Sequence, residues 1–400
     1  MLDKNYISRL YITSILVILS SFTGSSFAQE VRELKHVSAT ECQGCHQDIY
    51  LQWSQSMHAN STALKDPIHG LLYKSVIGDP KHEGVKQKGK YPVCLKCHAP
   101  VAAKDSKTNL AAMPVYNEGI NCVTCHAISG FKGVAKPEGG LRLGVDAYEF
   151  SETSLQGPGT NHTVNNWSHP AFPNAATPEI FKSNAICMGC HDQRKNSNKV
   201  PLCQTGSEID SVDGSKDCLS CHMPVVNGKA DHSFLGGHSA KMVSKGVLMT
   251  MTVAKNKNAL EVAINITNKL PHNFPTGAPF RNVYIKLSAY DQQGKQVWAS
   301  SQSHPAIDDK KAMFMYHLGD ADGHASTPPK ATQVLSDTRL KPHETRNLNY
   351  SLVVKDGIVK LRAVAYYDLL LPKMKNKFSN SEYDDLTSSK IIAVTEKYID

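Results

Sequence analysis

The chain has little of what would place it in a membrane or on a nucleic acid. After residue 28 no apolar run approaches the roughly 20 residues that a membrane-spanning helix requires. The lysines are dispersed, without the basic stripe or aromatic platform that binds nucleic acid. No cysteine follows Cys221, and no cysteine pair stands in the βαβ setting of a thioredoxin-like site. We therefore expect no membrane span in the mature chain and no nucleic-acid partner.

Residues 1–28 have the pattern of an export signal. Lys4 and Arg9 precede the apolar run LYITSILVILSSF, and SSFA offers a cleavage site after Ala28. We expect a cleaved signal peptide over 1–28 and a mature protein in the periplasm or outside the cell. An uncleaved N-terminal anchor is the alternative, and the short run interrupted by Thr and Ser disfavours it.

Histidine and cysteine are abundant, with 18 and 11 copies in 400 residues. Ten cysteines form five C-x-x-C pairs, and a histidine follows each pair directly. At this histidine frequency, five such histidines would arise by chance with a probability on the order of 10⁻⁷, so the histidine belongs to the motif. The five motifs are CQGCH at 42–46, CLKCH at 94–98, CVTCH at 122–126, CMGCH at 187–191 and CLSCH at 218–222.

The spacing of these residues explains their chemistry. Two cysteines three positions apart lie on one side of a helical turn, where they match the two vinyl groups of a porphyrin and form thioether bonds, while the adjacent imidazole reaches the iron. Structural zinc, a redox dithiol and disulfides are the alternatives, but zinc would need two pairs per metal and leave one pair over. We therefore expect five covalently bound c-type haems. The expected attachment residues are Cys42, Cys45, Cys94, Cys97, Cys122, Cys125, Cys187, Cys190, Cys218 and Cys221, with His46, His98, His126, His191 and His222 as iron ligands.

A second histidine on every iron would raise the requirement to ten, and residues 29–240 contain thirteen. Trp, Phe or Gly near some of them suits a flat macrocycle and a close backbone approach. On this basis the expected second ligands are His58, His162, His169, His232 and His238. The polar or Lys-rich surroundings of His36, His69 and His82 indicate solvated surface residues instead. His272, in PHNFPTG, is either a turn residue or a further ligand at a domain interface.

His46 and His58 are not expected to bind the same iron. Ile49, Trp53 and Met57, four residues apart, predict a largely helical segment between the two histidines. The histidines would then be about 18 Å apart along the helix axis. Two nitrogens on opposite sides of one metal are only about 4 Å apart.

Bis-histidine ligation also favours a low haem reduction potential. The remaining cysteine, Cys203, is expected to be a free thiol.

The chain divides at about residue 240. Residues 29–240 are expected to form a pentahaem cytochrome domain, mainly helical and irregular, in which haems supply much of the core. Residues 241–400 alternate apolar and polar residues at 246–256, 259–268, 282–291 and 345–357, with a buried run at 359–371. This pattern predicts an all-β immunoglobulin-like sandwich with a hairpin turn at DQQGKQ. Residues 306–331, with His317 and His324, and residues 376–389 are predicted loops.

The motifs resemble those of the multihaem c-type cytochromes related to the tetrahaem cytochrome c-554 of ammonia oxidisers. The similarity is carried by CQGCHQDIYLQWSQSMHA, the other four attachment motifs and DHSFLGGH, and PHNFPTGAPFRNVYIKLSAYDQQGKQV resembles the β-domain of exported members. The resemblance implies electron transfer through closely stacked haem pairs, with His58 as a distal ligand. The additional haem and the β-domain depart from the tetrahaem carrier, and the absence of C-x-x-C-K departs from the pentahaem nitrite reductases.

Two functions are open at this stage. We favour electron transport by an exported, iron-containing cytochrome, between redox partners such as a quinol dehydrogenase, a terminal reductase or other cytochromes, in anaerobic or inorganic-compound respiration. The alternative is a reductase or oxidase of nitrite, hydroxylamine or a sulfur oxyanion, with one open haem position. A third role, as a docking module, is open for the β-domain.

Overall fold

The computed structural model describes residues 33–157, 173–176, 179–212, 217–256, 258–353, 357–378 and 383–399. The expected signal peptide lies outside the described residues, as do His162 and His169. None of the helices in the described part of the chain combines the length and the apolar character that a membrane span requires.

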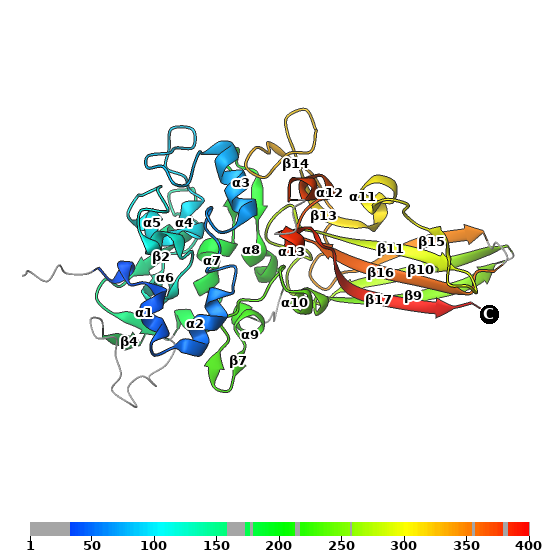
Figure 1. Cartoon of the computed structure of the whole chain (residues 1–400), viewed down its shortest axis with the longest axis horizontal. Coiled ribbons are helices and arrows are strands. Elements are labelled where there is room, and N and C mark those ends of the chain that lie inside the picture. Colours follow the sequence, from blue (N-terminus) through cyan, green and yellow to red (C-terminus); the bar gives the residue numbers. More distant parts are fainter. Residues whose placement is uncertain are drawn as a thin grey trace, which may run out of the picture. The chain divides into compact units, whose positions relative to one another are not determined.

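The described residues between 33 and 244 form short helices and two-stranded sheets, many of them joined by loops (Figure 1). The helices are η1 (Leu34–His36), α1 (Ala39–Gln43), α2 (Gln47–Ser54), α3 (Pro67–Val76), α4 (Leu95–His98), α5 (Pro100–Lys104), η2 (Pro114–Asn117), α6 (Cys122–His126), η3 (Gly144–Ala147), η5 (Ile180–Lys182), α7 (Ala185–His191), α8 (Thr205–Asp210), α9 (Cys218–His222) and α10 (Ala240–Ser244). The paired strands are β1 (Ile128–Phe131) with β2 (Tyr148–Phe150), β3 (Leu155–Gly157) with β4 (Asn174–Ala176), β5 (Arg194–Lys195) with β6 (Pro201–Cys203), and β7 (Val225–Val226) with β8 (Lys229–Ala230).

The protein core of this part is divided into small clusters. One surrounds Tyr73 and Leu95, another Tyr148 and Ile180, and a third Trp53. Such clusters bury little apolar surface each, so other interactions must hold the segments together. The helical and irregular character expected for this part is confirmed.

Asp105 ties the start of the described chain to α5. Its carboxylate lies 2.6 Å from Lys35 Nζ and 2.6 Å from His36 Nε2, and it accepts a hydrogen bond of 2.7 Å from the Tyr116 hydroxyl. Burial alone would raise the pKa of Asp105, but Lys35, His36 and Tyr116 together hold it below the usual value. The contact also explains His36 as a structural residue.

We predict that Asp105→Asn lowers the free energy of unfolding by about 1–3 kcal/mol at neutral pH, because three donors lose a charged acceptor. A carboxylate with a lowered pKa stabilises the fold above the ordinary aspartate pKa, and this stabilisation is lost as the pH falls through the lowered pKa. Denaturation midpoints of variant and wild type should therefore differ at pH 7 and converge in acid. Equal midpoints at pH 7 would contradict this role.

The second part of the chain, residues 245–399, contains two antiparallel sheets. Its strands are β9 (Val247–Asn256), β10 (Ala259–Asn268), β11 (Asn282–Tyr290), β12 (Gln296–Ala299), β13 (Met313–Gly319), β14 (Gln333–Asp337), β15 (Thr345–Val353), β16 (Lys360–Asp368) and β17 (Lys390–Tyr398). Its short helices are α11 (Pro305–Asp308), η6 (Lys310–Ala312), α12 (Pro372–Lys375), η7 (Asn376–Phe378) and α13 (Asp384–Thr387).

The sheets pack on one shared hydrophobic core. One has the order β15-β10-β9, and the other has the order β14-β13-β11-β16-β17, with β12 paired to β11. Alternate residues of β10, including Leu260 and Ile264, point into the core, which also contains Ile285 of β11 and Leu361 of β16. Alternation with period two therefore predicted β9, β10, β11 and β15 correctly, and the continuous buried run predicted β16. The long strands run beside one another in Figure 1.

Three local predictions were wrong. The stretch 306–331 contains β13, so His317 lies in a strand, because the apolar run MFMYHLG pairs with β11 and β14. The stretch 376–389 contains η7 and α13. The helix that follows His46 ends at Ser54 and does not continue to His58.

Residues 33–400 form one compact unit. Helix α10 packs against β17, and Asn196 after β5 donates to the carbonyls of Pro328 and Ala331. The two parts therefore share polar and apolar contacts, and a domain boundary at residue 240 stays a prediction.

Candidate haem-binding sites

The five C-x-x-C-H motifs occupy short helical turns. Helices α6 and α9 each begin at the first cysteine and end at the histidine, and their N-caps are the side chains of Asn121 and Asp217. The second and fourth motifs lie on α4 and α7, and the first runs from α1 to His46, the N-cap residue of α2. All eleven cysteines of the described chain are free of disulfides. Each cysteine pair is thus presented from one turn, as attachment to one porphyrin edge requires.

Cysteines from different motifs lie next to one another. The side chains of Cys42 and Cys122 lie close enough to interact, which brings the first motif against the third. Corresponding contacts join Cys97 to Cys190 and Cys187 to Cys218. The fourth motif therefore touches both the second and the fifth. The first motif thus lies beside the third and the second beside the fourth, so these spatial neighbours are not consecutive motifs in the sequence.

Two pairs of imidazoles have the spacing of ligands on opposite sides of one metal. The ring centres of His58 and His191 are 6.2 Å apart, and those of His126 and His232 are 6.4 Å apart. Two nitrogens trans on a metal are about 4 Å apart, and a ring radius at each end brings the ring centres to about 6 Å. Each pair therefore fits the two sides of one six-coordinate haem iron. In each pair, one histidine belongs to an attachment motif and the other is one of the expected second ligands.

Several of these rings also have the second hydrogen bond that is typical of metal-bound histidine. The Nδ1 atoms of His98, His126 and His222 lie 2.7–3.0 Å from backbone carbonyls. His232 Nδ1 lies 2.8 Å from the Ala230 carbonyl. A hydrogen bond from Nδ1 orients the ring and leaves Nε2 available for a metal.

His58 is positioned by the segment that leads to the third motif. The amide of Ile120 donates to the His58 carbonyl at 2.9 Å, and Trp53 Nε1 donates to the Ile120 carbonyl at 2.8 Å. Gly119 has φ +66°, and a Cβ at this residue would lie 2.1 Å from the His58 oxygen, so only glycine fits. Burial lowers the pKa of His58 to about 3, with a smaller contribution from His191. The ring is therefore neutral at pH 7, the state that binds a metal.

Tyr148 holds the turn of the fourth motif. Its hydroxyl donates to the Ile186 carbonyl and accepts from the Gly189 amide, both at 2.8 Å. A Cβ at Gly189 would lie 2.2 Å from the Tyr148 ring. The pKa of His191 falls to about 4, mainly through burial. Gly189, the second of the two residues between these cysteines, is therefore required by packing on Tyr148.

Two half-buried arginines have buried nitrogens that lack an acceptor in the described part of the chain. Arg194 lies close to the Cys97 sulfur, yet neither of its terminal nitrogens has a hydrogen-bond acceptor among the described residues. Arg281 donates from Nη1 to the Thr276 carbonyl at 3.3 Å, and its Nε is buried without a partner in the described chain. Burying a charged nitrogen without a partner is costly, so an anionic group beside these side chains would be favourable. The carboxylates of a porphyrin are such groups, and the residues present thus fit haem.

The surroundings of His69 differ from those that its neighbours in the sequence predict. Its ring centre is 4.2 Å from that of His98, and Nδ1 atoms of both rings lie within 3.0 Å of the Ser61 carbonyl. Its Nε2 is buried without a partner among the described residues, as is the Tyr73 hydroxyl. The spacing of His69 and Tyr73 on one face of α3 was the available signal. His69 is therefore not a solvated surface residue.

The other candidate residues have ordinary surroundings. His238 Nδ1 lies 3.5 Å from an oxygen of Asp385, and burial lowers the pKa of His238 to about 4. His82 is exposed, as expected. The sulfur of Cys203 lies 3.4 Å from the His191 carbonyl and 3.4 Å from the Thr205 hydroxyl.

Comparisons with known proteins agree with this geometry. Residues 41–127 match the family described as cytochrome c554 and c-prime. The chain is 44% identical to a penta-heme cytochrome c552 from Thermochromatium tepidum, with a TM-score of 0.86 over 92% of this chain and 100% of that chain. A β-glucosidase from Kluyveromyces marxianus matches 38% of this chain and 14% of its own at 12% identity, with a TM-score of 0.14, which is too low to indicate a shared fold. No curated protein matched the chain.

The match to the cytochrome c552 covers 92% of this chain, so it is not confined to one part of it. The chain belongs to the family of penta-haem c-type cytochromes and, like them, carries covalently bound c-type haems.

Proposed function

We propose that the protein is an exported pentahaem electron carrier, which passes electrons between redox partners in anaerobic or inorganic-compound respiration. The observation that carries the proposal is the spacing of His58 from His191 and of His126 from His232, at 6.2 and 6.4 Å. With a protein ligand on both sides of an iron, no position is left for a substrate, and electron exchange is the remaining chemistry.

The residues that would hold the haems are the five cysteine pairs and their adjacent histidines. His58 would be the second ligand at the fourth motif, and His232 the second ligand at the third. His162 and His169 remain proposed ligands outside the described residues, and His238 remains a proposed ligand inside them. Bound haem supplies reversible one-electron exchange at iron, at a potential that two imidazoles keep low.

The chain itself sets the order of the attachment sites. Contacts between cysteines place the first motif beside the third, the second beside the fourth, and the fourth beside the fifth. Short separations of this kind favour electron exchange between sites. The fourth motif, which touches two others, would be the junction through which the second and fifth motifs communicate.

Buried positive charge would make reduction easier. Arg194 and Arg281 would pair with porphyrin carboxylates, since the described chain gives their buried nitrogens no counter-ion. Each arginine would then both hold a propionate and favour the reduced iron.

Arg194→Gln is accordingly expected to lower the potential of at least one haem by roughly 50–100 mV, as the loss of a unit charge in a partly buried site implies. Spectroelectrochemical titration would measure the shift. Arg362→Gln is the matched control, because Arg362 pairs with Glu396 on β16 and β17. Unchanged potentials in the Arg194 variant would contradict the proposed pairing.

A second candidate function is favoured by the surroundings of the second motif. The ring of His69 lies 4.2 Å from that of His98, which is too close for ligands on opposite sides of one metal. The two rings share the Ser61 carbonyl, so their Nδ1 atoms approach the same point. An open position at this haem would allow reduction or oxidation of nitrite, hydroxylamine or a sulfur oxyanion.

Magnetic resonance of the oxidised protein separates the two functions. A carrier is expected to show only low-spin haem and no spectral change when nitrite, hydroxylamine or cyanide is added. A high-spin signal that these compounds shift, together with their turnover by the reduced protein, would favour the enzyme. If the high-spin signal changed in the variant His98→Met, the second motif would be identified as the site.

The remaining features of the proposal concern location and partners. A periplasmic location after cleavage at residue 28 and a quinol dehydrogenase or terminal reductase as partner fit the family and the lack of a spanning helix in the described residues. We also propose that the two sheets belong to the immunoglobulin-like class, which the packing of both on one core supports. N-terminal sequencing of the mature protein tests the cleavage site.

A further inference from the structure

Helix α8 packs directly on the fourth attachment motif. Gly206 lies near the start of α8, and a Cβ at this residue would be 2.3 Å from the Met188 sulfur and 2.7 Å from Asp192 Cβ. Met188 stands between the two cysteines of the motif, and Asp192 directly follows its histidine. The absence of a side chain at Gly206 therefore allows α8 to approach the motif this closely.

Hydrogen bonds from the next residue of α8 reinforce this contact. The amide and the hydroxyl of Ser207 both donate to Asp192 Oδ1 at 2.8 Å. Asp192 is only 4% exposed. Two donors on one buried carboxylate oxygen fix its position, so α8 and the end of the fourth motif form one rigid piece.

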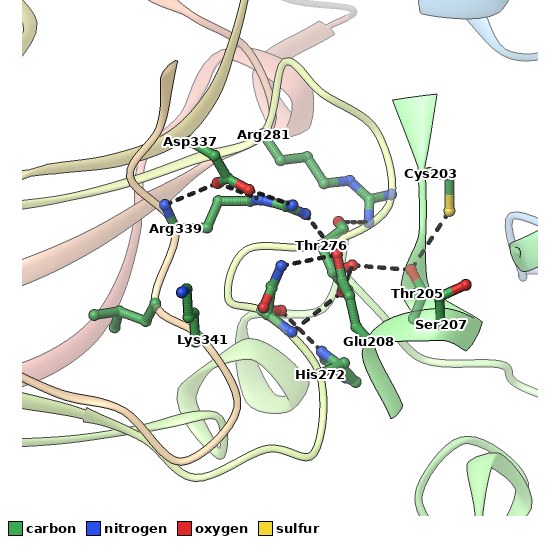
Figure 2. Close-up of polar contacts among 12 residues, drawn as sticks. Cys203, Thr205, Ser207, Glu208, His272, Thr276, Arg281, Asp337, Arg339 and Lys341 are labelled. Carbon is green, nitrogen blue, oxygen red and sulfur yellow. Dashed lines mark hydrogen bonds and ion pairs between the residues drawn. The ribbon is translucent and has the colours of Figure 1, made fainter. Parts of the chain in front are cut away.

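The residue after Ser207 fixes α8 to the second part of the chain (Figure 2). The side chain of Glu208 is only 7% exposed, and it pairs with Arg339 Nη1 at 2.8 Å. It also accepts hydrogen bonds from the Asn273 amide at 3.2 Å, from Asn273 Nδ2 at 3.0 Å and from the Thr276 hydroxyl at 2.7 Å. Four donors compensate the buried charge, so this contact holds α8 in one position.

The donors to Glu208 are themselves held by the two sheets. Asn268, the last residue of β10, donates from Nδ2 to the carbonyls of His272 at 2.8 Å and of Lys341 at 2.9 Å. Phe274 exchanges two backbone hydrogen bonds of 2.8 and 3.0 Å with Leu340. The loop after β10 and the residues after β14 are thus joined to each other, and they present the donors as one surface.

A second contact fastens the segment between the fourth motif and α8. Asn196 Nδ2 donates to the carbonyls of Pro328 at 2.8 Å and of Ala331 at 2.7 Å. Val200 is buried in one hydrophobic cluster with Ala331. The second part of the chain therefore holds residues 192–208 at two separate places.

We propose that the second part of the chain positions the fourth attachment motif, with Glu208 as the positioning residue. Gly206, Ser207 and Glu208 form the connection, since the first two residues contact the motif and its flanking aspartate while the third binds the second part. The two sheets would then support the haem that joins the second and fifth motifs. This inference rests on the proposed binding of that haem iron by His58 and His191.

The relative orientation of two imidazole rings provides the readout. The planes of the His58 and His191 rings are 36° apart. The magnetic resonance signal of a low-spin ferric haem with two histidine ligands depends on this angle. Movement of the fourth motif should therefore shift the signal of one haem, whereas a purely structural weakening elsewhere would leave it unchanged.

Glu208→Gln, in the full-length mature protein, removes the charge that fixes α8. The variant is expected to keep five haems by pyridine haemochrome and to shift one low-spin signal, with the other signals unchanged. Hydrogen exchange at the Gly189 and Asp192 amides is expected to be about tenfold faster, because a buried charged acceptor has been lost. Both amides are hydrogen-bonded within the fourth motif and its cap, to the Tyr148 hydroxyl and the Met188 carbonyl.

Two further variants make the comparison specific. Glu344→Gln is the matched control, because Glu344 pairs with Arg346 within the second part, and it is expected to leave every haem signal as in the wild type. Gly206→Ala alters the connection at its other end, where the new methyl group would meet Met188. It is expected to shift the same signal as Glu208→Gln.

The proposal is overturned if Glu208→Gln leaves every low-spin signal unchanged, or if Gly206→Ala alone shifts one, since α8 would then hold the motif without the second part. Where Glu208→Gln is not exported, Thr276→Val removes one donor to the carboxylate. A shift of the same signal is again expected, and an unchanged signal would overturn the proposal. A wild type with fewer than five haems would instead refute the proposed function, so the two failures are distinguishable.

Discussion

A variant with serine at both Cys187 and Cys190 is expected to contain four haems in place of five and to distribute electrons slowly among them. The fourth motif touches the second through Cys190 and Cys97, and the fifth through Cys187 and Cys218. Removing its thioether bonds therefore removes both a haem and the junction between motifs. His58 also loses the haem iron that it would share with His191.

Pyridine haemochrome and intact mass would count the haems, and flash reduction would follow electron redistribution. Cys203→Ser is the control, because Cys203 lies near His191 but belongs to no attachment motif. The control is expected to retain five haems. A double variant that still carried five, or a Cys203 variant that lost one, would contradict the assignment of the attachment cysteines.

The second large effect is expected from His58→Ala. The variant should keep all five haems, since no attachment residue changes, but one low-spin ferric signal should be replaced by a high-spin signal. The physical reason is the spacing of 6.2 Å between the rings of His58 and His191, which suits ligands on opposite sides of one iron. Low-temperature magnetic resonance would measure the change, and imidazole should reverse it.

His36→Ala serves as the control for this variant. His36 pairs with Asp105 and lies on the same N-terminal stretch of the described chain, so general damage to that stretch would appear in both variants. Only the His58 variant is expected to gain a high-spin haem. If both variants remained low-spin, His58 would not be an iron ligand.

The attachment motifs could be predicted from the sequence because their chemistry is local. Two cysteines and a histidine on one helical turn are sufficient for haem attachment, so the pattern CxxCH carries the whole signal. β9, β10, β11 and β15 were predictable for a similar reason, since alternation with period two is a property of neighbouring residues. The ring of His58 lies 6.2 Å from that of His191, and its binding to an iron other than that of His46 stays a prediction.

What the sequence could not indicate is which distant residues meet. His69 was predicted to be a surface residue because its neighbours in the sequence are polar. In the structure, its ring on α3 packs against that of His98. Likewise, β13 was predicted as a loop, because its role depends on pairing with β11 and β14. Glu208 accepts hydrogen bonds from Asn273 and Arg339, which are 65 and 131 positions away in the sequence, and no local pattern marks such contacts.

The most direct test of the account is a count of the electrons that each chain exchanges. In an anaerobic coulometric titration of the mature protein, we expect five electrons per chain to be taken up and returned, with the same spectra in both directions. Fewer electrons, or a reduced form that cannot be reoxidised to the starting spectrum, would contradict a pentahaem carrier.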